Sequence, residues 1–330
     1  MGWGPDMLTS ASMNEREFTV DGRRYVEPAA LDAERRDVFD RAWLFVAPAS
    51  ELQRSGASVS VAWREHQRII VERKDARLLV HGPGDVQLAQ WRGQVWVSTH
   101  PDPPSLAEHL GALSEDLAPY ALADFTPIHS ATHELACNWK APLDISLESY
   151  HLDAVHGATI GRVVSQQGQR CTAFGDHQRM VVDVADYGWR RWLDERTSRG
   201  GPYDATKQSA LHRYFIFPNT ILNILPSQMT MYTSWPLAAE RCRLEYRFCV
   251  RPGAGVFEWT RARLTAWVSA IVLREDLPVL RRFQQGVGAL GEAPCQLHQD
   301  ELPVARFHRS LARWMAPEQP EVERPVTGVG

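Results

Sequence analysis

Two histidines five residues apart, His151 and His156, most constrain what this chain can fold into. They lie in residues 138–156, which read NWKAPLDISLESYHLDAVH. Five residues turn an undisturbed α-helix by about 500°, so both rings share a face only if the helix bends or ends, and Gly157 is where we expect it to end. Two neutral imidazoles and one carboxylate from elsewhere can hold Fe(II) in a facial triad with open coordination positions. The pair alone also fits ordinary surface or core histidines, so both interpretations stay open.

The residues around the pair resemble the iron-binding segment of Rieske non-heme iron oxygenase alpha subunits, the ring-hydroxylating oxygenase family. The shared frame consists of Asn138-Trp139-Lys140, Glu148, Tyr150-His151 and His156. The resemblance implies that His151 and His156 are iron ligands. It also implies that Glu148 is the bridging carboxylate, which links an iron-ligating histidine to a cluster-ligating histidine on the neighbouring subunit of a head-to-tail trimer. The chain departs from the family at Asp144-Ile145, where the family carries Glu-Asn and so a polar group near the iron.

A carboxylate for the third position is expected on a long helix near the C-terminal end. Residues 256–287 place apolar side chains at 264, 267, 268, 271 and 272, the spacing of a helix packed on a sheet. Glu275 and Asp276 interrupt that apolar face. The resemblance implies Asp276 as the ligand, with Glu275 in reserve, whereas either acid considered alone would be an exposed helix residue. Pro278 removes a backbone donor and should loosen the helix just beyond the acid.

The N-terminal part predicts a helix and a small antiparallel sheet. Residues 31–46 show helical spacing through Val38, Ala42 and Phe45, and short β-rich runs follow from residue 57. A Rieske [2Fe-2S] centre needs two cysteines and two histidines, yet no cysteine precedes Cys137. We therefore expect no cluster in this chain, a short connection at residues 83–93 in place of cluster loops, and ordinary surface roles for three histidines, His66, His81 and His100.

Together these resemblances imply an α+β fold with two domains. Residues 1–20 are predicted to be a flexible arm and 317–330 a disordered tail. Residues 21–128 should form the first helix and a reduced, cluster-free Rieske-like antiparallel β domain. Residues 129–316 should form a helix-grip (START/Bet v 1-like) catalytic domain, in which a curved antiparallel sheet wraps a long helix, with residues 189–210 as a loop or lid. The predicted walls of an apolar substrate pocket are Ile145, Phe217, Leu222, Ile224 and Val272.

The composition limits which partners and which cellular compartment we expect for this protein. A net charge of −4 gives no basis for a nucleic-acid partner. No apolar run is long enough to span a bilayer, and the first residues lack the apolar core of a signal peptide. Five scattered cysteines are typical of reduced thiols, so we expect a cytoplasmic protein without membrane contact.

Two classes of function remain. The resemblance implies an oxygenase component that activates O2 at mononuclear Fe(II) to hydroxylate, dihydroxylate or demethylate a small organic substrate. Its electrons would come from a Rieske-bearing partner subunit and a reductase, within a trimeric or hetero-oligomeric assembly. The alternatives are a non-catalytic, structural subunit of such an assembly and a helix-grip protein that only binds a ligand.

Overall fold

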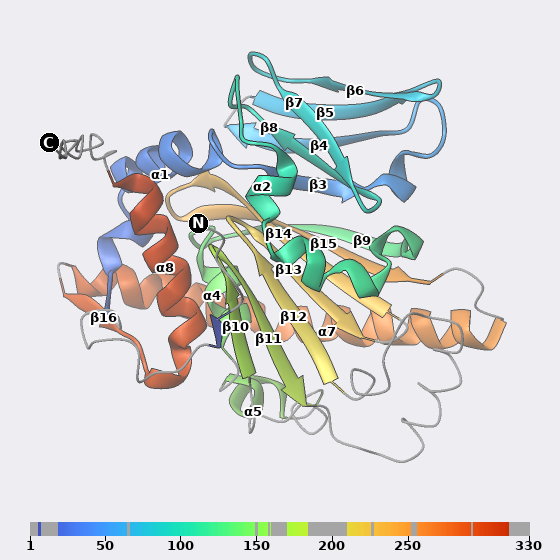
Figure 1. Cartoon of the computed structure of the whole chain (residues 1–330). Coiled ribbons are helices and arrows are strands. Elements are labelled where there is room, and N and C mark those ends of the chain that lie inside the picture. The colour runs from blue at the N-terminus through green and yellow to red at the C-terminus, as the bar shows by residue number, and fades with distance from the viewer. Residues whose placement is uncertain are drawn as a thin grey trace, which may run out of the picture.

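The computed structural model describes residues 6–7, 19–64, 67–148, 151–157, 159, 170–183, 210–225, 228–251, 256–291 and 293–316. Within them, helices pack on both faces of one large antiparallel sheet, and a smaller β region formed by residues 44–98 lies beside it (Figure 1). The predicted α+β class is confirmed. The expected arm, lid and tail fall almost entirely outside the described residues.

The large sheet has eight strands in the order β1-β10-β11-β12-β13-β14-β15-β9, and every pairing is antiparallel. Its strands are β1 (Asp6–Met7), β9 (Thr126–Leu135), β10 (Arg170–Phe174), β11 (His177–Asp183), β12 (Ala210–Ile216), β13 (Thr220–Leu225), β14 (Gln228–Ala238) and β15 (Arg241–Val250). As predicted, β9 leads directly into the helices that carry the histidine segment. Helices cover both faces of the sheet around its central strands, so β12, β13, β14 and β15 have few exposed side chains.

The long helix α7 (Val256–Leu290) crosses one face of the sheet, and α2 (Leu106–Leu110) and α3 (Leu113–Asp116) lie on the other (Figure 1). The short helices α4 (Ala141–Leu147) and α5 (His151–His156) lie on the α7 side, as does α8 (Leu302–Met315). The predicted apolar stripe of α7 is partly wrong, because Leu264 and Trp267 are more than 60% exposed. Smaller residues such as Ala262 and Ala266 are buried instead, and a small side chain lets a helix approach a sheet closely.

The N-terminal region departs from three predictions. Helix α1 (Pro28–Glu34) passes into a π-helical turn, η4 (Arg35–Phe39), and the chain is then extended as β3 (Leu44–Pro48), so Phe45 belongs to a strand. The strands form two three-stranded sheets, β4-β5-β6 and β3-β8-β7, where we expected one. Their bounds are β4 (Ser58–Arg64), β5 (Gln67–Lys74), β6 (Arg77–His81), β7 (Gln87–Trp91) and β8 (Gln94–Ser98). The expected connection at residues 83–93 thus contains a strand, because β7 pairs with β8 across the tight turn at Arg92-Gly93.

Short elements complete the described chain. They are β2 (Thr19–Asp21), paired with β16 (Pro294–Gln296), and the 3-10 turns η3 (Gly22–Tyr25), η5 (Ala49–Leu52), η6 (Ala118–Tyr120), η7 (Leu122–Asp124) and η9 (Gln299–Glu301). All five cysteines are free thiols. Among the described residues, no helix combines the length and apolarity needed to cross a bilayer.

Candidate metal centre

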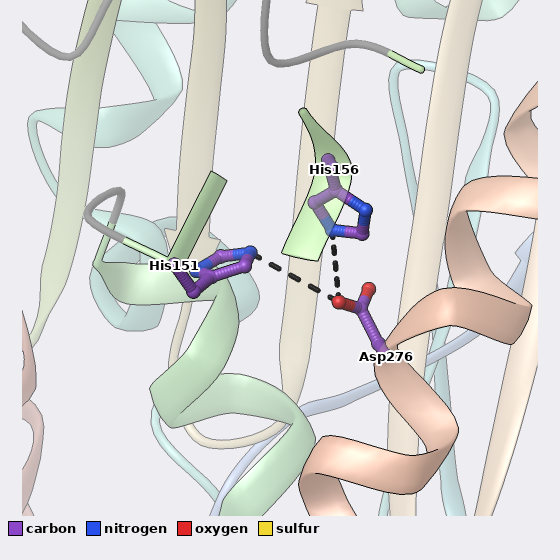
Figure 2. A group of neighbouring side chains, drawn as sticks. All are labelled: His151, His156 and Asp276. Carbon is purple, nitrogen blue, oxygen red and sulfur yellow. Dashed lines mark ion pairs between the residues drawn. The ribbon is translucent and has the colours of Figure 1, made fainter. Parts of the chain in front are cut away.

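His151, His156 and Asp276 converge, with one potential ligand atom from each lying within 4.8 Å of the other two (Figure 2). Both histidines come from α5, which ends at His156 and is followed by a turn at Gly157, as the spacing predicted. Asp276 comes from the middle of α7. Its Oδ1 lies 2.9 Å from Nε2 of His156 and 4.0 Å from Nε2 of His151. The structure therefore brings together the three residues that the sequence selected.

The donor set fits a divalent cation. Oδ1 of Asp276 is buried and makes no hydrogen bond within the described structure, despite its short distance to His156. A buried carboxylate oxygen without a partner is costly, and a cation between it and two imidazole nitrogens would remove that cost. Two histidines and one carboxylate are also the ligands of non-heme Fe(II) sites with open positions.

Glu148 orients the first histidine. Its Oε1 contacts Nδ1 of His151 and its Oε2 accepts a hydrogen bond from the His151 backbone N–H at 3.2 Å. The expected proximity is therefore present, but it does not arise on one continuous helix. Helix α4 ends at Leu147, and Glu148 is extended, with φ −120° and ψ 172°. The acid contacts His151 across a break in the helix, and Nε2 of that ring is left to face Asp276.

Glu275 orients the second histidine, a role that the sequence did not indicate. Its Oε2 lies 2.7 Å from Nδ1 of His156 and accepts a hydrogen bond of 2.8 Å from the Thr159 hydroxyl. Burial lowers the pKa of His156, but the carboxylates of Asp276 and Glu275 beside its ring outweigh burial and raise that pKa. A carboxylate on the far nitrogen fixes the ring and its tautomer, as is usual for metal-ligating histidines. The two adjacent acids thus lie on different sides of the His156 ring: Asp276 faces Nε2 and Glu275 contacts Nδ1.

Residues 138–140 anchor the histidine segment to both ends of the chain. The Asn138 backbone N–H donates to the Gln284 side chain at 2.8 Å, two turns beyond Asp276 on α7. The Asn138 amide donates to the backbone oxygens of Tyr25 and Ala239 at 3.3 and 2.6 Å. These bonds hold the start of the segment at a fixed place along the helix that carries Asp276.

A buried ion pair supports the same segment. Lys140 donates to Glu34 at 2.6 Å, and both side chains are at most 1% exposed. Trp139 donates to the other oxygen of Glu34, also at 2.6 Å. Burial lowers the pKa of Lys140, and the charge of Glu34 opposes this. Glu34 satisfies two donors at once, a role that its sequence position did not reveal.

Asp144 has a structural role. It accepts a hydrogen bond of 2.7 Å from Tyr25 and lies 3.0 Å from Nε2 of His308, so its carboxylate is used by α8 and the N-terminal turn. Its neighbour Ile145 is partly buried against the main hydrophobic cluster.

The predicted pocket walls are partly wrong. Leu222 and Ile224 belong to the cluster packed against α2 and α3. Strand side chains alternate, so their neighbour Asn223 points to the opposite face, where it contacts Arg213. The Phe217 ring packs at a tilt against Trp314 of α8, with the two ring centroids 5.1 Å apart. Ile145 and Val272, the latter one turn before Asp276, remain predictions for the pocket.

Five other described histidines make contacts away from the triad. His177 accepts from the Phe217 N–H at 3.0 Å and bonds the backbone oxygen of His109 at 2.7 Å. His212 bonds the Tyr120 hydroxyl at 2.8 Å. In the β region, His81 is exposed beside Glu72, the half-buried His100 bonds a neighbouring backbone N–H, and His66 lies outside the described residues.

The model of the ring-hydroxylating alpha subunit catalytic domain matches residues 122–317, more than half of the chain. The chain belongs to this family. It is 20% identical over 365 residues to the carnitine monooxygenase oxygenase subunit of Escherichia coli (strain K12), covering 91% of this chain and 94% of that protein. It is 19% identical over 204 residues to the glycine betaine monooxygenase oxygenase subunit of Pseudomonas aeruginosa, covering 53% and 48%.

Solved structures of the family share the fold. A quaternary ammonium Rieske monooxygenase gives a TM-score of 0.74 at 15% identity, covering 95% of this chain and all of that one. Naphthalene 1,2-dioxygenase from Rhodococcus sp. gives 0.73 at 14% identity, covering 92% and 96%. The resemblance seen in the sequence is confirmed, and the chain is an oxygenase alpha subunit of a non-heme iron family whose members act on small organic molecules.

Proposed function

We propose that this chain activates O2 at one Fe(II) held by His151, His156 and Asp276, and hydroxylates or demethylates a small organic substrate. The observation that carries this proposal is the unpartnered Oδ1 of Asp276 facing two imidazoles. When bound, the metal would supply open coordination positions for dioxygen. Glu148 and Glu275 each hold one imidazole by its Nδ1, which fixes the ring and leaves Nε2 as the nitrogen that would bind the metal. The names of the curated relatives support charged, carnitine-like molecules as substrates.

Metal analysis tests this proposal. After anaerobic reconstitution, we expect about one Fe(II) per chain, and loss of that iron in His151→Ala. His100→Ala changes a histidine outside the triad and is the matched control. An unchanged iron content in His151→Ala would reject the site. Iron bound normally, but without oxygen consumption in a complete electron-transfer mixture, would favour the non-catalytic subunit.

We further propose that the electrons come from a Rieske cluster on a partner subunit and pass Glu148. The sequence supports this, because no cysteine precedes Cys137 in the region where the family builds its cluster. Glu148 supports it too, since its carboxylate already contacts the far nitrogen of His151. The assembly would be a head-to-tail trimer or hetero-oligomer served by a reductase in the cytoplasm, a compartment consistent with five free thiols.

Glu148→Gln tests the electron route. It should leave iron content and assembly nearly unchanged and slow both cluster oxidation and product formation, because a charged link between two imidazoles is neutralised. The experiment mixes the chain with cluster-bearing subunits and a reductase and follows both signals. Full turnover by the isolated chain with reductase alone would refute the partner, and an unaffected Glu148→Gln complex would refute the route.

A further inference from the structure

Arg213 is a cation held beside the metal centre. It lies on β12, and its Nη1 donates to the backbone oxygen of Ser146, two residues before Glu148, at 2.5 Å. Its Nε donates to Oδ1 of Asn223 at 2.8 Å, and the Asn223 amide in turn donates to the Thr230 hydroxyl at 3.1 Å. These contacts fix the guanidinium on the face of the sheet that carries α4 and α7.

The Arg213 guanidinium has N–H groups that donate to no described residue. Nη2 makes no hydrogen bond to any residue that the structure describes, and no carboxylate of the described chain lies within ion-pair distance, 4.0 Å, of Arg213. Burial lowers the pKa of Arg213, and the charges of Tyr232, Glu148 and Asp276 oppose this. Part of the side chain nevertheless remains accessible. Glu148 contacts His151, and Asp276 faces the two imidazoles of the triad, so neither carboxylate is a dedicated counter-ion for Arg213.

A partly buried charge without a dedicated partner is unfavourable, and its place is explained if a ligand supplies the partner. Arginine suits this task because its planar fork matches the two oxygens of a carboxylate. We propose that Arg213 binds a carboxylate of the substrate and so selects organic acids over their neutral analogues. This proposal rests on the proposed function only in taking the bound acid as the molecule that reacts.

Equilibrium binding tests the proposal without turnover. The probes are benzoate, phenylacetate and butyrate, each compared with its amide by calorimetry, in protein loaded with Fe(II) under nitrogen and in metal-free protein. At least one acid should bind about 10- to 100-fold more tightly than its amide, the range for hydrogen bonds to charged groups. Arg213→Gln should abolish that preference with the iron content unchanged, and Arg213→Lys should keep part of it.

Two more variants, at Arg243 and Asn223, test whether the preference for acids belongs to Arg213. Arg243→Gln changes an arginine on β15 that pairs with Glu134, and it should leave the preference intact. Asn223→Ala releases Nε but keeps the charge, so a partial loss is expected even if Arg213→Gln fails to fold. A preference for acids that survives in Arg213→Gln, or that appears only in iron-loaded protein, would mean that the acid ligates the metal and would overturn the proposal. Equal binding of acids and amides by the wild type would also overturn it. If the protein still binds iron normally in these experiments, failure of this proposal does not affect the proposed oxygenase function.

Discussion

Removing the Glu275 carboxylate should weaken Fe(II) binding although it removes no ligand. Its Oε2 lies 2.7 Å from Nδ1 of His156, whose other nitrogen lies 2.9 Å from Oδ1 of Asp276. Without this acceptor the ring can rotate or change tautomer, and its proton can occupy the nitrogen that the metal needs. Loss of such a partner costs about 10- to 100-fold in metal affinity, or about 1.4–2.7 kcal/mol. Asp276→Ala removes a ligand, so its loss should exceed that range.

The measurement is an anaerobic competition for Fe(II) between the protein and a coloured chelator, which gives a dissociation constant for each variant. Glu275→Gln should lie between wild type and Glu275→Ala, because an amide oxygen still accepts a hydrogen bond. Thr159→Val removes the other donor to Oε2 and should have a smaller effect. Glu27→Ala, at an exposed acid, is the control. Wild-type affinity in Asp276→Ala, with complete loss in Glu275→Ala, would show that the two acids have exchanged roles.

Three further predictions concern the cluster, the buried ion pair and pH. The purified chain should lack the visible absorption and reduced-state EPR signal of a Rieske centre, and two additional irons with acid-labile sulfide would contradict this. Lys140→Met should destabilise the fold by about 3–5 kcal/mol in urea unfolding, because the charge of Glu34 is left buried without its cation, and adding Glu34→Leu should recover only part of the loss, since Trp139 then loses its acceptor. Burial lowers the pKa of His109 from 6.5 to about 3, so folding disfavours its charged form. Stability should therefore be full above pH 6.5 and fall towards pH 3, by about 2 kcal/mol between pH 6.5 and 5. His109→Leu should lack that fall, and an equal fall in the variant would contradict the assignment.

The ligand residues could be selected from the sequence because each stands in a local frame. Residues 138–140 and Glu148 fix the position of the two histidines, and the paired acids mark one place on a long helical pattern. The choice of Asp276 over Glu275 rested on resemblance. The structure places the two acids on opposite sides of the His156 ring, a relation between distant segments that one helix pattern does not contain.

Other features depend on packing that periodicity cannot reveal. Strands covered on both faces read as continuous apolar runs, so nothing in residues 220–225 tells which side chains face α7, and Leu222 was assigned to the wrong face. Phe45 kept helical spacing with Val38 although a π-turn and a strand intervene. Arg213 carries no motif, and only the fold places it beside Ser146.

The hydrogen bond between Asn138 and Gln284 has a consequence for biosynthesis. The histidine pair leaves the ribosome long before α7, and both the third ligand and the residue that aligns the segment with it belong to the last fifth of the chain. A nascent chain therefore displays two histidines without their carboxylate and without their tether. Iron can be retained only after residue 276 has been synthesised and has folded onto the histidine segment, so a stalled chain that ends before residue 276 should emerge without it.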